Sequence, residues 1–596
     1  MPDKKNNQGL FSKITSILAY KPPRRNTFVL PELKDEDSYR VTPEDRAEMD
    51  YGETGGGREA GSDRGKTNKK PVRAREWSKV KGGKANGGKK DEPESISPDL
   101  DVSLAVIKRE LHVPQNLDVV IREFKLAREI DAFIVFIDGM ADRNTINDFI
   151  LRQLMSPVPF ENYRGGCRME YISGNVLTVN QTARLEQYKD VIIQVLMGVT
   201  AIFVDGCDTC LAVETRGFEK RGIEKPSTEA VVRGSQEAFT ENLKTNVTQL
   251  RRIIKNKDLI HETVIAGQET NSLISILYMR GMANPALVRE VKRRVKSIKT
   301  DMILGSGMIE QLIEDNTWMI IPQVLATERP DRTASHLMEG KVAIITEGSP
   351  FSIVVPVTFH SLMQSPEDYF LRWQFGTAAR LVRTMALFIA MFLPALYIAM
   401  TNYHQEMIPT DLLISIARAR EVVPFPSIVE VLLMEISFEL IREAGIRVPG
   451  LIGTTLGIIG ALILGQAAVA ANIVSPILII IVAVTGLGNF AIPNYSLAYG
   501  VRLLRFIFII LGGLLGFFGI SVGMVMAAAA ALSMKSFGVP FLSPSWPKTT
   551  VLDQMIRCPI WLDEERPDAV NPLNRRRQPE IARGWTREEP PKGKRE

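Results

Sequence analysis

The chain has 596 residues, with 73 Lys and Arg against 68 Asp and Glu, so its formal net charge of +5 is small for its size. This length indicates several domains, and four cysteines are too few for a disulfide scaffold. A mean hydropathy of +0.00 combines a charged N-terminal part with an apolar block near the C-terminal end. No signal peptide is evident, because residues 1–13 are polar and the apolar run 14–20 is too short for one. We therefore expect the N-terminal domain to stay in the cytosol.

Residues 1–98 are expected to form a disordered basic tail. Residues 53–61 are rich in glycine, and residues 66–90 form a basic low-complexity run with few apolar side chains. Such a segment buries too little surface to offset the entropy cost of ordering it. Two interpretations stay open: a tail that touches an anionic membrane, and a solvated linker.

Residues 99–364 are expected to fold as a soluble α/β domain that is large enough for two subdomains. The apolar run 131–138 predicts a buried strand. Hairpins are predicted around Asp205-Gly206 and Glu347-Gly348. The other predicted elements are strands at 263–267 and 273–278 and helices over 144–155, 235–255 and 284–298, the last with Asn284 as its cap and Pro285 in its first turn.

Residues 365–535 are expected to form a polytopic α-helical membrane domain of about four to five spans. An aromatic and arginine-rich approach is followed by apolar segments of bilayer-crossing length at 384–403, 451–471, 476–492 and 506–534. Four spans leave the N-terminal domain and the tail 536–596 on the cytosolic side, in agreement with the positive-inside rule. Arg502 and Arg505 are the only charged residues between Arg447 and Lys535, and four spans leave them on the outer side, where they do not fit.

The segment 426–444 has helical apolar spacing but carries several charges. At about 100° per residue, Glu435, Glu439, Arg442 and Glu443 share one face, and Glu430 lies away from it. One interpretation is an interfacial helix with this face in water. The other is a fifth span whose acidic face lines a cavity, because charge at membrane depth is costly and usually functional.

The sequence shows no chemistry typical of an enzyme, and we expect no cofactor or metal. Cys207 and Cys210 form one CxxC without a second pair, and it follows a hairpin strand, so coincidence is the favoured explanation. The five histidines show no close ligand spacing, and no phosphate-binding loop or nucleophile elbow occurs. No internal repeat is visible either.

The polar residues of the apolar block are mostly uncharged. In an apolar helix such residues either bond across helices or line a water path, and packing is the favoured role for any single one. Gly512 and Gly516 are spaced to permit close approach of two helices. The candidate pore-lining residues are Thr455, Gln466, Asn472 and Asn489, with Glu435 and Glu439 as a cation-attracting face.

Long stretches of this chain resemble a known family. Residues 424–449 read PFPSIVEVLLMEISFELIREAGIRVP, and the stretch that follows, LIGTTLGIIGALILGQAAVAANIVSPILIIIVA, continues the match. Three more blocks agree, at 222–252, 328–356 and 536–547. Together they resemble the A subunits of GerA-type spore germinant receptors, over roughly residues 99–577.

The resemblance implies an A subunit in the spore inner membrane, with its N-terminal domain facing the spore core. It also implies assembly with a transporter-like B subunit and a C-subunit lipoprotein, and self-association around a nutrient-gated channel for monovalent cations. An accessory SpoVAF-like channel protein that amplifies germination, and a secondary transporter, are the alternatives. Neither a nucleic-acid partner nor an enzymatic activity is expected.

Overall fold

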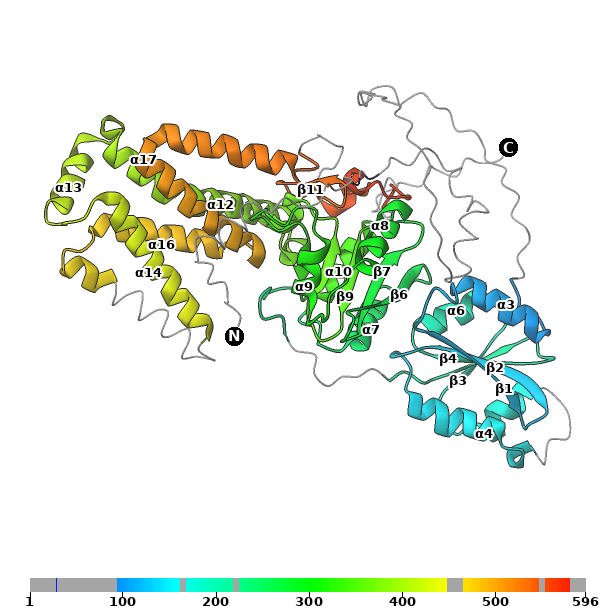
Figure 1. Ribbon diagram of the computed structural model, residues 1–596. Coiled ribbons are helices and arrows are strands. Elements are labelled where there is room, and N and C mark those ends of the chain that lie inside the picture. The colour runs from blue at the N-terminus through cyan, green and yellow to red at the C-terminus, as the bar shows by residue number, and fades with distance from the viewer. Residues whose placement is uncertain are drawn as a thin grey trace, which may run out of the picture.

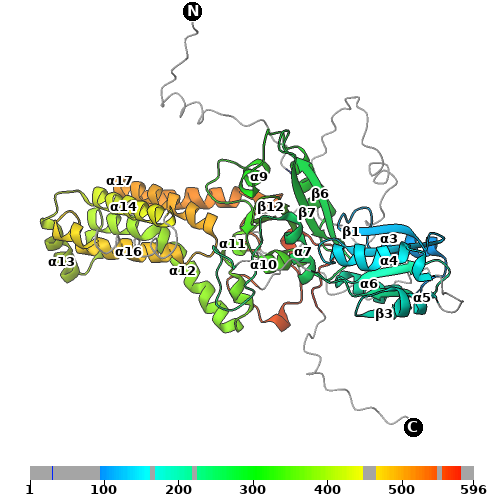
Figure 2. The same ribbon diagram turned by 90° about the horizontal axis from the view of Figure 1, so that it is seen from below.

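The computed structural model describes residues 28, 30, 94–160, 168–217, 225–447, 465–545 and 553–578. Two α/β subdomains lie next to each other, and a bundle of long helices extends from the second of them (Figures 1 and 2). Of the predicted tail 1–98, the structure describes Phe28, Leu30 and residues 94–98. Ser95 pairs with Gln187 and Ile96 is buried in the first subdomain, so ordered structure begins a few residues earlier than expected. Leu30 is buried against the second subdomain.

The first subdomain is an antiparallel five-stranded sheet with helices on both faces. The strand order is β1-β2-β4-β5-β3, and apolar cores lie on each side of the sheet. The central strand β2 (Ile130–Ile137) is buried along nearly its whole length, which is why its sequence is a continuous apolar run. The other elements are α3 (Leu100–Glu110), β1 (Val119–Leu126), η3 (Thr145–Leu151), α4 (Arg152–Met155), η4 (Val158–Phe160), α5 (Arg168–Tyr171), η5 (Ile172–Val176), β3 (Thr182–Leu185), α6 (Tyr188–Leu196), β4 (Thr200–Val204) and β5 (Cys210–Val213).

The second subdomain repeats this arrangement. Its strand order is β6-β7-β9-β10-β8, again antiparallel throughout, and each strand has its counterpart in the first sheet. Its elements are α7 (Leu243–Ile253), β6 (Leu259–Ala266), β7 (Ser272–Met279), α8 (Pro285–Lys296), α9 (Ser306–Ile313), β8 (Leu325–Thr327), α10 (Pro330–Met338), β9 (Val342–Thr346), β10 (Ser352–Val355) and α11 (Phe359–Met363). The sequence shows no internal repeat, yet the two halves share one topology.

Most predicted elements of the α/β region are confirmed, including both hairpins. Gly206 and Gly348 each have φ of +76°, the left-handed conformation that these turns need. Asn284 caps α8 by accepting a hydrogen bond from the Ala286 amide at 2.9 Å. The helix expected over 235–255 is shorter than predicted, because Asn242 caps α7 and the preceding residues form a loop.

The helical bundle contains α12 (Trp373–Asn402), α14 (Ser427–Arg447), α16 (Pro476–Phe490) and α17 (Tyr495–Ser533), with η6 (Pro366–Tyr369) before it and η7 (Gln405–Met407) and α13 (Thr410–Glu421) at its far end (Figure 1). Among the described residues, α12 and α17 are long and apolar enough to cross a membrane, and α16 is shorter. Most of segment 451–471 lies outside the described residues. The closing elements are β11 (Lys535–Ser536), β12 (Val539–Pro540), η8 (Ile560–Leu562) and η9 (Asp568–Val570).

The segment 506–534 does not form the single span that its composition predicts. The helix begins earlier, at Tyr495, and its backbone turns at Gly516, where φ is +60° and ψ is −141°. The two halves then pack on each other, since Phe508 and Ile520 share one apolar cluster. Gly512 does permit the expected close approach, because a Cβ there would lie 3.0 Å from the Ala395 carbonyl of α12.

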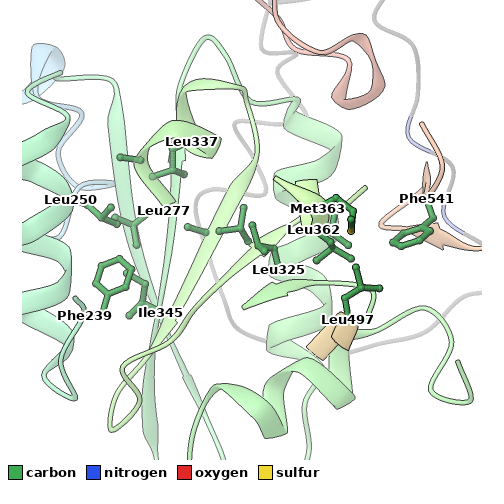
Figure 3. Packing of buried hydrophobic residues seen from close by; sticks show 14 of the residues in the cluster. Phe239, Leu250, Leu277, Leu325, Leu337, Ile345, Leu362, Met363, Leu497 and Phe541 are labelled. Carbon is green, nitrogen blue, oxygen red and sulfur yellow. The ribbon is translucent and has the colours of Figure 1, made fainter. Parts of the chain in front are cut away.

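The core of the second subdomain continues into the helical bundle. Phe239, Leu277 and Ile345 belong to the same cluster as Leu497 of α17 and Phe541 of the C-terminal segment (Figure 3). The sheet and the start of α17 therefore share one packed core, and a movement of either element disturbs the other.

Candidate functional site

A cluster of charged side chains lies inside the helical bundle, between α14 and α17. Glu435 and Glu439 project from α14, four residues apart, and Arg502 and Arg505 project from α17, three residues apart. Both spacings place the paired residues on one helix face, so the acidic face of α14 meets a basic face of α17. Arg502 and Arg505, which did not fit the predicted topology, thus lie inside the bundle and pair with the acids of α14.

The distances define a bridged network. Arg505 Nη2 lies 3.1 Å from Glu435 Oε2 and 3.0 Å from Glu439 Oε1. Arg502 Nη1 lies 3.1 Å from Glu439 Oε2. Arg442 Nη1 approaches the same oxygen at 3.3 Å from within α14. Glu439 is therefore the central acid, which contacts three guanidinium groups.

Glu435, Arg502 and Arg505 are buried in apolar surroundings, and Glu439 is 26% exposed. Glu435 and Arg505 have side chains that are 0% and 1% exposed. The Arg442 guanidinium lies over the rings of Phe438 and Phe490, and that of Arg502 lies 3.6 Å from the ring centre of Tyr499. Cation–π contacts of this kind stabilise guanidinium groups that have lost their water.

Three arginines against two glutamates leave one positive charge in excess. Within the described residues, both Glu435 oxygens, Nε and Nη1 of Arg505 and all three nitrogens of Arg442 lack a partner with hydrogen-bond geometry. Buried polar atoms are nearly always satisfied in native proteins. Among the described residues of the bundle, this cluster therefore holds most of the buried side-chain atoms that lack a hydrogen-bond partner.

The interpretation of 426–444 as an interfacial helix with its acidic face in water does not hold. Glu435 is fully buried, and Glu439 is turned toward α17. Glu443 alone among the face residues is exposed, and it pairs with Arg447 at 2.7 Å. Glu430, expected to lie apart, accepts a hydrogen bond from the Ser475 amide at 3.2 Å and lies 3.8 Å from Arg420.

The uncharged candidate residues do not gather in one place. Thr455 lies outside the described residues. Gln466 and Asn472 are exposed, and Asn472 has a positive φ of 55° in the turn before α16. Asn489 is buried at the other end of α16, and its Oδ1 atom has no hydrogen-bond partner in the described part of the chain.

Sequence reasoning missed the pairing of the acids with the arginines. The signal was present, because acids at i and i+4 on one helix complement arginines at i and i+3 on another. A span that begins at Phe506 leaves both arginines outside the helix, whereas α17 begins at Tyr495 and includes them. Cys210 of the CxxC is buried in strand β5, and burial raises the pKa of its thiol, which disfavours the reactive thiolate.

Comparison with known proteins identifies the family. Residues 105–569 match the family described as Bacillus/Clostridium GerA spore germination protein. The chain belongs to the GerA family. Among GerA relatives, spore germination protein KA of Bacillus subtilis (strain 168) is 41% identical over 82% of this chain and 90% of its own length.

Two further GerA relatives cover similar spans. The uncharacterized membrane protein YfkQ of Bacillus subtilis (strain 168) is 39% identical over 79% of this chain and 91% of its own length. Spore germination protein GerLA of Bacillus cereus is 36% identical over 77% and 94%. The crystal structure of the N-terminal domain of the A subunit of the Bacillus megaterium spore germinant receptor GerK3 matches 44% of this chain and 97% of that domain, with 33% identity and a TM-score of 0.36.

Proposed function

We propose that this protein is the A subunit of a spore germinant receptor, which oligomerises in the spore inner membrane to form a nutrient-gated cation channel. Membership of the GerA family supports the role in germination. B-type and C-type receptor subunits are the proposed partners, and the α/β subdomains face the spore core. The observation that supports a gated pathway is the buried charge cluster between α14 and α17.

The cluster lies near the middle of α14 and of the first half of α17, residues 495–515. With a rise of about 1.5 Å per residue, Arg505 is about 15 Å from the start of α17 and Glu435 is about 12 Å from the start of α14. If these helices cross a bilayer core of about 30 Å, the charges sit near its midplane. Ionisable groups at that depth are costly and usually belong to a functional pathway.

The pairing changes the proposed role of the two acids. Glu435 and Glu439 were expected to attract cations, but both carboxylates are covered by guanidinium groups. We therefore assign them to an ion-pair lock that holds α14 against α17 in a closed state. Thr455, Gln466, Asn472 and Asn489 stay as proposed pore-lining residues.

The shared core offers a route from the soluble domain to the lock. Leu497 of α17 packs with the second subdomain, about 1.4 turns before Arg502 and about 2.2 turns before Arg505 (Figure 3). A rearrangement of the subdomain would shift this end of α17 and strain the ion pairs. A two-state element of this kind is what coupling between distant sites requires.

Potassium flux from liposomes that hold the purified full chain tests the lock. Glu439→Gln should raise the resting leak about tenfold or more, because it leaves the buried Arg502 guanidinium without its acid. Removing one partner of a buried ion pair costs about 3–5 kcal/mol, less where one side chain is partly exposed as Glu439 is, and every 1.4 kcal/mol is a factor of ten. Gln466→Leu should lower the flux if that side chain lines the path.

Glu443→Gln is the matched control, since Glu443 sits one turn further along α14 and its side chain is 55% exposed. It should leave the leak at the wild-type level. Equal leaks for wild type, Glu439→Gln and Glu443→Gln, at equal amounts of reconstituted protein, would refute the lock.

A secondary transporter is the second candidate, and two observations favour it. Transporters often carry charged sites at the bilayer midplane and helices with broken backbones, and here the ion cluster and the turn at Gly516 have those features. The same liposomes separate the two functions. Saturable exchange that is strictly coupled to a second solute would establish the transporter and reject the channel.

A further inference from the structure

The C-terminal segment carries an exposed apolar surface that the proposed channel does not use. Between residues 555 and 562, most large apolar side chains are exposed: Met555, Ile556, Ile560, Trp561 and Leu562. Large apolar side chains gathered and exposed in one segment are typical of an interaction site. The sequence suggested only a cytosolic tail here.

This segment is held firmly in place by buried polar contacts. Asp553 Oδ1 accepts hydrogen bonds from Arg380 Nη1 at 2.8 Å and from the Cys558 amide at 3.0 Å. The Arg557 amide donates to Thr377 Oγ1 at 3.1 Å, and its guanidinium lies 4.4 Å from the ring centre of Tyr369. The exposed apolar side chains are thus displayed by a fixed loop against the first turns of α12.

The loop lies beside the first turn of α12. Together with the start of α12 it lines a groove of about 480 Å³, with Trp373 and Trp561 among the lining residues and Arg372 beside them. Along α12 the exposed apolar surface continues through Phe375, Val382 and Met385. The loop therefore extends the surface of the helix that is proposed to enter the membrane.

We infer that residues 555–562 form a monotopic anchor that lies in the headgroup region of the cytosol-facing leaflet, beside the entry point of α12. Tryptophan rings at the boundary, aliphatic side chains beyond them and a neighbouring arginine match the chemistry of a phospholipid interface. The inference rests on the proposed membrane placement of α12. It goes beyond the channel because it gives the C-terminal segment a partner of its own.

The anchor has a structural consequence. Arg380 and Arg383 of α12 share the buried carboxylate of Asp368, and Arg380 also binds Asp553 of the loop. The membrane surface, the C-terminal segment and the start of α12 would therefore form one unit. A lipid-held loop fixes the height of α12 relative to the bilayer.

Photo-crosslinking of the full chain in phosphatidylglycerol and phosphatidylethanolamine liposomes tests this inference. p-Benzoylphenylalanine is placed at Ile560, at Ile265 or at Phe388, one position per variant, and the adducts are identified by mass spectrometry. Ile560 and Ile265 are 61% and 62% exposed, so they are matched, and Ile265 lies on the soluble strand β6. Phe388 of α12, 53% exposed, reports on the proposed span itself.

We expect lipid adducts at 560 and 388, with the yield at 560 about tenfold above that at 265. Lipid adducts at 388 and none at 560 would overturn the anchor and leave the span intact. No lipid adducts at either position would refute the membrane placement as well. Adducts at 560 with another protein chain, in place of lipid, would show that the surface is a subunit interface and would overturn the lipid assignment.

Discussion

Arg505 is a charged residue whose role depends on a partner far away in the sequence. It is fully buried, and it bridges two glutamates about 70 positions earlier. Burying an unpaired guanidinium in an apolar bundle would cost several kcal/mol. Helix α17 can therefore pack here only because the two glutamates neutralise Arg505. The same argument applies to Arg502, which Glu439 and Tyr499 hold.

Glu310 of α9 gives a prediction at the scale of one residue. Burial and the neighbouring Glu314 carboxylate raise the pKa of Glu310 from 4.5 to about 7. Folding raises this pKa, so the folded state binds the proton more tightly than the unfolded state does. The resulting contribution to the free energy of unfolding is complete below pH 4.5 and is lost as the pH rises through 7. Glu310→Gln should therefore be more stable than wild type at pH 8, by at most about 3 kcal/mol, and equal to it near pH 4.5.

Thermal unfolding of the full chain in detergent at pH 5 and pH 8 measures this difference. Glu269→Gln is the control, because Glu269 is exposed on the same subdomain. A gain of stability for Glu310→Gln that does not change between the two pH values would contradict the titration of Glu310.

Helix α17 shows how one residue divides an element. Its apolar sequence runs without a break, but residues 495–515 and 517–533 form two packed halves around Gly516. Only glycine adopts φ of +60° with ψ of −141° without strain. A Cβ at this position would also lie 3.0 Å from the Tyr403 ring. The turn therefore depends on the glycine and on the end of α12 beside it.

Gly516→Ala should destabilise the bundle by about 1–3 kcal/mol, because the backbone strain is no longer relieved. Fluorescence-detected gel filtration after graded heating in detergent measures the shift in the melting temperature. Gly307→Ala is the matched control, since Gly307 lies in helix α9 with open space around its Cβ position. It should be neutral or slightly stabilising. An unchanged melting temperature for Gly516→Ala would mean that the two halves form one straight helix.

The two α/β subdomains of the whole molecule are joined by a buried ion pair. Arg251 of α7 donates to both oxygens of Asp118 beside β1, at 2.7 and 2.9 Å, and the two side chains are 2% and 6% exposed. Burial alone would raise the pKa of Asp118, but Arg251 and His261 outweigh it and hold the pKa well below its ordinary value. Asn116 accepts a further hydrogen bond from Arg251 at 3.3 Å.

Arg251→Met should separate the subdomains, because it leaves the Asp118 carboxylate buried without its main partner, at a cost of about 3–5 kcal/mol. Hydrogen exchange of the β1 and α7 amides in the full chain should rise, while exchange in the β9 core stays at the wild-type rate. Arg289→Met, an exposed position on α8, is the control. Unchanged exchange at both sites in Arg251→Met would show that the other contacts between the subdomains, such as Lys257 with Glu110 and His112 with Asp258, hold them without this ion pair.

Most local elements of this chain could be predicted from the order of its residues alone, as could a charged α/β part followed by an apolar helical part. Continuous apolar runs mark strands that are buried on both faces, the dipeptides Asp205-Gly206 and Glu347-Gly348 mark the hairpins, and the lack of charge marks the helical block. These signals are local, so they can be read from neighbouring residues. The long blocks shared with the GerA family identified the function class in the same way.

Contacts between residues far apart in the chain could not be predicted in this way. The repeat of the α/β fold, the turn at Gly516 and the pairing of Glu435 and Glu439 with Arg502 and Arg505 all depend on packing between segments far apart in the chain. A charged face has the same sequence whether water or another helix covers it. Its partner is set by which surfaces the folded chain buries together, because only burial makes an unpaired charge too costly to keep.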